Sequence, residues 1–189
     1  MKSKGKQNPF VTLLDLLNVK HTQDFSNRYF NEHPHKYNLF GLSKMLSDYG
    51  VENVATRIAD KEKNISEIEI PFIAHFGGDF AVVHKTDANH VSFIWRGNNH
   101  VLPVSEFAEA WSGVVLLAES SEKSIEPNYN EHRKTERVNF LKKAALFSAS
   151  CFILLWAYIH QSLSCYSYTQ LFYYSIILFC LEAVIWLRY

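Results

Sequence analysis

The sequence has no cysteine before Cys151, although its 189 residues include three cysteines in all. Residues 1–150 therefore hold neither a disulfide framework nor a thiolate zinc site, and they offer no cysteine nucleophile. An excess of charge is also absent, because 19 basic residues balance 19 acidic ones. A protein whose whole surface binds nucleic acid would be strongly basic, so we expect no nucleic-acid partner.

Charge is scarce in the last quarter of the chain. From Ala144 onward only Glu182 and Arg188 are formally charged. The runs 144–160 and 171–187 are apolar on all sides, and each is close to the roughly 17–25 residues that span a bilayer as a helix. We therefore expect two transmembrane helices within 144–189 and the lipid bilayer as a partner. The alternative is a buried helical hairpin of a soluble fold.

The basic residues predict the orientation of this hairpin. The loop 161–170 carries no charge, whereas basic side chains precede the first run and follow the second: Arg133, Lys134, Arg137, Lys142, Lys143 and Arg188. Positive-inside counting places both ends in the cytoplasm, so we expect an inner-membrane protein whose soluble domain faces the cytosol. Cys165 in the outer loop is a candidate for disulfide or redox exchange. Glu182 is either a functional group or a residue within reach of the interface.

The periodicity of residues 1–119 predicts helices first and a sheet second, which is an α+β plan. Asn8-Pro9 is typical of a helix start, and Gly50 is typical of a residue that follows a helix end. The expected helices are 8–18, 22–30, 39–49 and 105–111. The expected strands are antiparallel and cover 54–58, 71–76, 80–86, 90–96, 100–102 and 113–118, with turns at 77–79, 87–89 and 97–99. A polar linker is expected over 120–143.

The soluble part shows no complete constellation of catalytic or metal-binding residues. His33 and His35 flank a proline, which is either a partial metal site or a surface turn, and no further ligands accompany them. A serine nucleophile elbow is absent, and no cysteine is present to replace it. We therefore expect neither a metal nor a cofactor.

The order of these elements and several motifs resemble the bacteriocin-processing (double-glycine) cysteine peptidase domain, a papain-like unit found at the N-terminus of peptide-exporting ABC transporters. The resemblance rests on Tyr49-Gly50-Val51, on Ile70-Pro71-Phe72-Ile73-Ala74-His75, on Phe80-Ala81-Val82-Val83, and on Trp111-Ser112-Gly113-Val114-Val115-Leu116-Leu117. The chain is most similar to the variant that is fused to a vitamin K epoxide reductase-like membrane domain, a disulfide-forming module.

The catalytic residues implied by this resemblance are missing. The nucleophilic cysteine of the family opens the first helix, where this chain has residues 8–12 and no cysteine. The general base is a histidine directly before the strand 80–83, and here Asp79 stands at that position. The orienting aspartate would fall near Trp95, where no carboxylate stands. Without thiolate and imidazole the acyl transfer has neither nucleophile nor base.

The resemblance implies a membrane-tethered, inactive peptidase-like module that binds a leader or exported peptide in secretion or maturation. His75 and Asp79 mark the candidate peptide-binding neighbourhood, and transporter or oxidoreductase membrane subunits are the expected protein partners. One alternative is the N-terminal portion of a vitamin K epoxide reductase-like thiol-disulfide oxidoreductase. That enzyme would need closely spaced cysteine pairs, which these 189 residues lack. The other alternative is a structural membrane anchor without a ligand.

Overall fold

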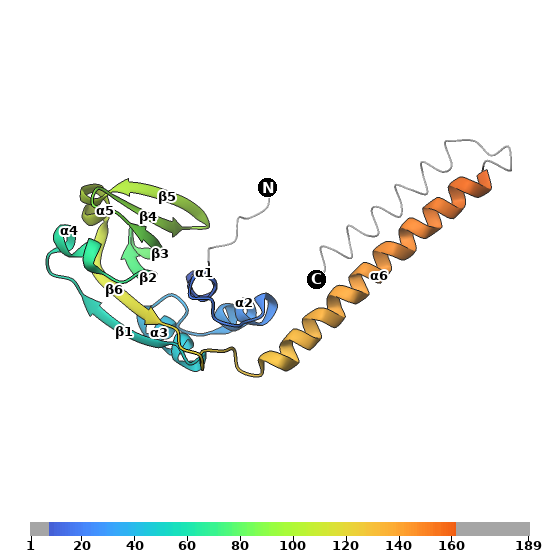
Figure 1. The fold of residues 1–189 in the computed structure, drawn as a ribbon, viewed down its shortest axis with the longest axis horizontal. Helices are drawn as coiled ribbons and strands as arrows, with labels where there is room; N and C mark the ends of the chain where they lie inside the picture. The colour runs from blue at the N-terminus through green and yellow to red at the C-terminus, as the bar shows by residue number, and fades with distance from the viewer. Residues whose placement is uncertain (1–7, 162–189) are drawn as a thin grey trace. The chain divides into compact units, whose positions relative to one another are not determined.

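The computed structural model describes residues 8–161, and the chain divides into two compact units, Met1–Arg133 and Lys134–Tyr189. The first unit combines helices with one antiparallel sheet, and its element order confirms the expected α+β plan (Figure 1). Its helices are α1 (Pro9–Leu16), α2 (Gln23–Glu32), α3 (Leu39–Asp48), α4 (Lys61–Asn64) and α5 (Val104–Ala110), with a 3-10 turn at Ile65–Glu67. Its strands are β1 (Glu52–Arg57), β2 (Phe72–Phe76), β3 (Asp79–Thr86), β4 (His90–Trp95), β5 (Asn98–Pro103) and β6 (Trp111–Glu119).

The first and third helices begin where their local chemistry predicts, and a glycine follows the end of the third, whereas α1 ends at Leu16, two residues before the predicted end. Asn8 caps α1, because its side-chain oxygen accepts a hydrogen bond from the N–H of Val11 at 3.1 Å, and Pro9 takes the first helical position. Asn38 caps α3 in the same way. Gly50 follows α3 with φ +68°, a left-handed conformation that glycine adopts without steric cost.

The sheet has six strands in the order β1-β6-β2-β3-β4-β5, and every neighbouring pair is antiparallel. Strands β2 to β5 form a meander of three hairpins, as the sequence predicts. β6 then returns between β1 and β2, pairing Leu116 with Ala55 on one side and with Ile73 on the other. β1 and β5 are therefore the two edge strands.

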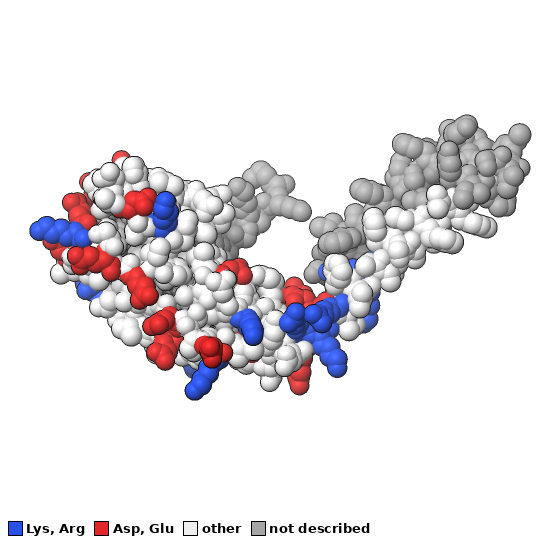
Figure 2. Space-filling model, viewed as in Figure 1, with Lys and Arg blue, Asp and Glu red and all other residues white. Residues whose placement is uncertain are grey.

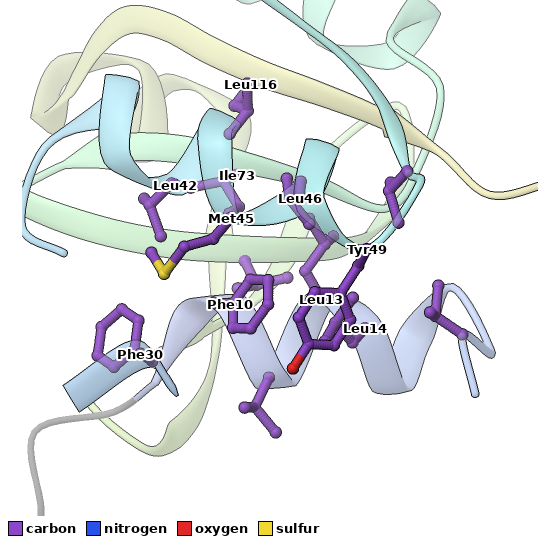
Figure 3. Close-up of a cluster of buried hydrophobic side chains, with 14 of the residues drawn as sticks. Phe10, Leu13, Leu14, Phe30, Leu42, Met45, Leu46, Tyr49, Ile73 and Leu116 are labelled. Carbon is purple, nitrogen blue, oxygen red and sulfur yellow. The ribbon is translucent and has the colours of Figure 1, made fainter. Parts of the chain in front are cut away.

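Two hydrophobic clusters lie on opposite faces of this sheet, because successive side chains of a strand alternate between faces. Figure 3 shows the first cluster, in which α1 and α3 pack on Ile73 and Leu116 of the sheet; Phe80 and Val82 of β3 also belong to it. The second cluster lies on the other face, around Phe107 of α5 and Trp111, and includes Phe72, Ala74, Phe76, Ala81, Val83, Val91, Phe93 and Val115. The sheet is thus the middle layer of the unit.

The segment after β6 is fastened to the helices through Glu126. Its carboxylate is buried and accepts hydrogen bonds from the N–H of Thr22 at 2.6 Å, from the Thr22 hydroxyl at 3.0 Å and from the Ser26 hydroxyl at 3.2 Å. His132 lies 2.7 Å from the same carboxylate, and its ring stacks on Phe25. The sequence predicts a linker over 120–143, whereas here Glu126 is part of the first compact unit, which extends to Arg133.

The helix α6 (Tyr129–Gln161) begins three residues after Glu126 and continues from the first unit into the second. It contains the whole segment 144–160 that the sequence predicts as the first membrane span. Within residues 8–161 no helix is long and apolar enough to cross a membrane. The predicted second span, 171–187, lies outside the described residues, as do Cys165 and Glu182.

Replacing Glu126 with alanine should destabilise the first unit by about 3 kcal/mol, because the hydrogen-bond donors of Thr22 and Ser26 would remain buried without their acceptor. Guanidinium unfolding of the whole chain, followed by tryptophan fluorescence, would measure this loss. The matched control is Glu122→Ala, a removal of the same side chain at a nearby exposed position, for which we expect less than about 0.5 kcal/mol. Equal effects of the two variants would contradict a structural role for the buried carboxylate.

Candidate functional site

Five polar and aromatic residues gather at the end of the sheet where the β2–β3 hairpin, the end of β4 and the start of β6 meet. We call His75, Asp79, Trp95, Arg96 and Ser112 the hairpin-end cluster. Strand pairing brings their elements together, because Phe76 of β2 pairs with Asp79 on one side and with Trp111 on the other. Trp95 of β4 contacts this hairpin, because its ring lies edge-to-face against the ring of Phe76, with the two ring centroids 5.4 Å apart.

The turn that presents Asp79 consists of two glycines. Gly77 and Gly78 have φ +56° and +75°, the double positive φ of the tight turn that matches the twist of antiparallel strands. Gly77 also lies against Trp95, since a Cβ atom at Gly77 would sit 3.3 Å from the indole. The hairpin is therefore held in place by backbone conformation and by close contact with β4.

Asp79 interacts with a cation. One of its carboxylate oxygens accepts a hydrogen bond from the N–H of Phe80 at 2.9 Å, and the other lies 3.8 Å from Nε of Arg96. The Arg96 guanidinium lies over the Trp95 ring, with its central carbon 4.4 Å from the ring centroid. The sequence predicts a turn at 97–99, but Trp95 pairs with Asn98, so the turn consists of Arg96 and Gly97. Both have positive φ, and this turn places Arg96 beside Asp79.

Trp95 has a buried indole nitrogen without a hydrogen-bond partner. The ring itself is packed among Phe76, His100 and the guanidinium of Arg96. The resemblance places the orienting carboxylate of the family near this residue. Here the position holds a large aromatic side chain, which fills space and stacks with a cation.

His75 and Asp79 point to opposite faces of the sheet. His75 pairs with Phe80, whose side chain belongs to the cluster under α1 and α3, whereas Asp79 pairs with Phe76 of the other cluster. Nδ1 of His75 lies 3.0 Å from the hydroxyl of Ser112, and its ring lies 5.7 Å from that of Phe80. The structure therefore does not bring the two sequence-predicted site residues into contact, and each has partners of its own.

The 3.0 Å distance between His75 and Ser112 is within the range of a catalytic base and its nucleophile. The pair has no orienting carboxylate, because within residues 8–161 no carboxylate contacts the ring of His75. The Ser112 hydroxyl also accepts the N–H of Val114 at 3.3 Å, which is a hydrogen bond within its own strand. This geometry is that of a surface hydrogen bond between β2 and β6.

The start of α1, where the resemblance implies a cysteine, presents the amide side chain of Asn8. Besides capping the helix, Asn8 donates a hydrogen bond from Nδ2 to Oδ1 of Asn27 at 3.0 Å. α1 packs against β2 and β3, so its N-terminal residues belong to the same layer as Phe80. Among the described residues Cys151 of α6 is a free cysteine, and it belongs to the second unit.

The first unit also contains the histidine pair around Pro34 and two tyrosines with raised pKa values. The rings of His33 and His35 lie 6.2 Å apart, and among residues 8–161 no group of three potential metal ligands occurs. Burial lowers the pKa of His33, and His35 and Lys44 lower it further. Burial and a hydrogen bond to Asp48 raise the pKa of Tyr29 to about 12. Burial also raises the pKa of Tyr49, opposed by its hydrogen bond with Ser26.

A match to a known protein family shows which family this chain belongs to. Residues 11–123 match the model of the peptidase C39 family. The chain belongs to the peptidase C39 family. The match covers more than half of the chain and spans all the helices and strands of the first unit from α1 to β6, although α1 begins two residues before it. Among curated proteins, none matches the chain.

Solved structures share the C39 fold. A double-glycine-motif protease from an AMS/PCAT transporter, crystallised with its leader peptide, matches with a TM-score of 0.53 and 16% identity, over 64% of this chain and 89% of that one. The peptidase domain of Streptococcus ComA, a bifunctional ABC transporter of a quorum-sensing pathway, matches with a TM-score of 0.52 and 11% identity, over 64% of this chain and 96% of that one. The papain-like arrangement of helices and antiparallel sheet expected from the sequence is thereby confirmed.

Three of the five residues in the hairpin-end cluster were not predicted from the sequence to lie at one site. They are Trp95, Arg96 and Ser112. For Arg96 and Trp95 the one local signal was Gly97, which marks a turn but does not place its start at Arg96. Ser112 carried none, because its contact with His75 depends on β6 lying beside β2. That pairing joins residues 37 positions apart in the sequence.

Replacing either turn glycine with alanine should destabilise the hairpin-end cluster, by about 1 kcal/mol for the positive φ alone. We expect the larger loss for Gly77→Ala, because the new methyl group would press on the Trp95 ring, whereas Gly78 has open space around it. Thermal unfolding of both variants measures the difference. A larger loss for Gly78→Ala would contradict the close contact between Gly77 and Trp95.

Proposed function

We propose that this chain is a membrane-tethered C39 domain that binds a leader or exported peptide without cutting it. The observation that carries the proposal is the Asp79–Arg96 pair. At the position where the resemblance predicts the imidazole base, this chain has a carboxylate that is bonded to Phe80 N–H and faces a guanidinium. Such a group is not matched to accept a proton from a thiol, and no cysteine precedes Cys151 to supply that thiol.

Peptide binding is supported by the fold that this chain shares with a leader-peptide complex. The double-glycine-motif protease was crystallised with its leader peptide, and the present chain covers 89% of that protein. Loss of catalytic groups leaves the strands and helices that form such a fold in place. The peptide would bind as an extended segment, with backbone hydrogen bonds supplying affinity and apolar side chains supplying specificity.

Membrane tethering is the second part of the proposal. It is supported by the uncharged run that begins at Ala144 and by the large apolar side chains that α6 exposes: Leu146, Phe147, Phe152, Ile153, Leu155 and Trp156. Lysine and arginine side chains gather over the first turns of α6 (Figure 2), as expected for a segment on the cytoplasmic side of a membrane. Membrane subunits of a transporter or an oxidoreductase are the partners we propose for this segment.

A panel of double-glycine leader peptides tests binding and cleavage together. The whole chain, purified in detergent, should bind one or more leaders with a dissociation constant of about 1 µM, or about 8 kcal/mol. Mass spectrometry of the same mixtures should show no cleavage, with or without a thiol-blocking reagent. Cleavage that persists through purification and thiol blocking would contradict the inactive state, and absence of binding across the panel would contradict the docking role.

Asp79→His is expected to restore no peptidase activity, because a base without a nucleophile leaves the barrier of acyl transfer unchanged. The matched control is Asp79→Asn, which removes the charge without supplying a base. Leader cleavage by the histidine variant alone would show that another group in this domain already serves as nucleophile.

The membrane topology predicts that Cys165 is accessible from outside the cell. In a variant with Cys151 and Cys180 replaced by serine, a membrane-impermeant thiol reagent should label intact cells. Labelling that appears only after lysis would contradict the topology. Recovery of the chain in the high-speed supernatant would contradict tethering itself.

A further inference from the structure

The edge strand β1 is accessible on both faces and along its outer side. Of its six residues only Asn53 is partly buried, and Val54 is 63% exposed. Asn53 is held because its side chain hydrogen-bonds to Ser43 and Ser47 of α3, which fixes one end of the strand to the helix layer. The other five residues of β1 are exposed.

The phase of the ladder identifies which backbone groups face outward. Ile58 donates its N–H to the carbonyl of Gly113 at 2.8 Å, directly beyond the pair of Arg57 and Val114. In an antiparallel ladder every second residue bonds to the same neighbour, so residues 52, 54 and 56 bond to β6. Asn53, Ala55 and Arg57 therefore present their N–H and C=O groups at the free edge.

A small hollow lies beside this edge and is lined by carboxylates around an apolar floor. Its volume is about 220 Å³, and the lining residues include Val54, Leu117, Glu52, Glu69 and Glu119. Val54 pairs with Leu117 across the two strands, so both side chains lie on one face. The dimensions and lining suit the aliphatic stem and charged head of a lysine or arginine.

The three carboxylates lack any cation of their own. Glu52 and Glu119 are directly opposite each other in the β1–β6 ladder, an arrangement of like charges that destabilises a strand pair. Within residues 8–161 the side-chain carboxylates of Glu52, Glu69 and Glu119 have no ion-pair or hydrogen-bond partner. Arg57 projects to the other face by alternation. Figure 2 shows acidic side chains gathered over the β1 and α4 region.

We propose that the free edge of β1 is a docking site for an extended segment of another protein that carries lysine or arginine at every second position. The segment would add as a further antiparallel strand, bonding to the outward groups of Asn53, Ala55 and Arg57. Alternation would place its basic side chains on the face of Val54 and the three carboxylates. The incoming charges would relieve the repulsion between Glu52 and Glu119.

The other edge of the sheet is not suited to the same role. The hydrogen bond from Val104 to Asn89 sets the phase of the β4–β5 pair, so residues 99, 101 and 103 of β5 face outward. Residue 103 is a proline and lacks an N–H group, which is a common way to block strand addition at an edge. β1 contains no proline.

The β1 edge is distinct from the hairpin-end cluster. β6 begins at Trp111 beside that cluster and ends at Glu119 beside Glu52, so the two sites lie at opposite ends of one strand. Binding of a leader peptide near Asp79 and binding of a basic strand at β1 can therefore be measured independently, and either can fail without the other.

The test uses the whole chain and a labelled hexapeptide, Lys-Val-Lys-Ser-Lys-Val, followed by fluorescence anisotropy at low and high salt. A peptide of the same composition with its three lysines consecutive is the first control. We expect the alternating peptide to bind at least about fivefold more tightly than the control, with affinity that falls as salt rises. A third peptide, N-methylated at the amides that would face β1, should lose binding.

Two variants of the chain separate the charge from the edge. Glu52→Gln with Glu119→Gln should weaken binding about tenfold, whereas the control pair Glu62→Gln with Glu109→Gln, also exposed acids, should leave it unchanged. Ala55→Pro removes one outward N–H and should abolish binding. If that variant does not fold, the N-methylated peptide tests the same hydrogen bonds on the parent chain.

Absence of binding at about 1 mM peptide, or binding that survives both N-methylation and the Glu52/Glu119 change, would overturn the proposal. Two other outcomes would assign the edge to a different occupant. Tighter binding after Lys2, Lys4 and Lys6 are changed to glutamine would point to this chain's own N-terminal residues. A dimer in light scattering that Ala55→Pro dissociates would point to a second copy.

Discussion

The sheet is covered with apolar contacts on both faces, and this constraint organises the first unit. β2 and the first half of β3 have almost no position at which a polar side chain could reach water, because one set of alternate residues packs under α1 and α3 and the other packs around Phe107 and Trp111. Polar groups are therefore confined to the strand ends and to the two edge strands. Both proposed binding regions, the hairpin-end cluster and the free edge of β1, lie at positions where side chains need not be buried.

Strand alternation also explains why the hairpin-end cluster is divided. His75 and Asp79 are close in sequence, yet their side chains lie on opposite faces of the sheet. His75 contacts Ser112, and Asp79 forms an ion pair with Arg96. The chain shares its fold with solved C39 peptidase domains, and the ends of its strands present Asp79, Trp95 and Arg96. Membership of the C39 family thus describes the scaffold, and the ion pair of Asp79 and Arg96 beside Trp95 describes what this end of the sheet presents.

Much of the fold was predictable because its signals are local. Asn8-Pro9, Gly50 and Gly77-Gly78 mark a helix start, a helix end and a hairpin, and the switch from helical to alternating periodicity after Gly50 separates the helices from the sheet. The cluster was less predictable, since Arg96 reaches Asp79 only because the turn begins one residue earlier than its glycine suggests. Glu126 was missed for a different reason. A charged residue in a polar stretch is typical of a linker, and its donors, Thr22 and Ser26, lie 100 or more residues away.

The position of Glu126 has a mechanical consequence. The carboxylate is held by α2, its backbone N–H bonds to Lys20, and the N–H of Ile125 bonds to Tyr49 at the end of α3. Because α6 begins at Tyr129, any tension along the C-terminal part of the chain enters the first unit at this point and is shared by α2 and α3 before it reaches the sheet. Several short bonds loaded together resist a pull far better than the same bonds loaded one after another. A pull on the C-terminal part of the chain would therefore act first on the hydrogen bonds of Glu126 and Ile125, before it acts on the sheet.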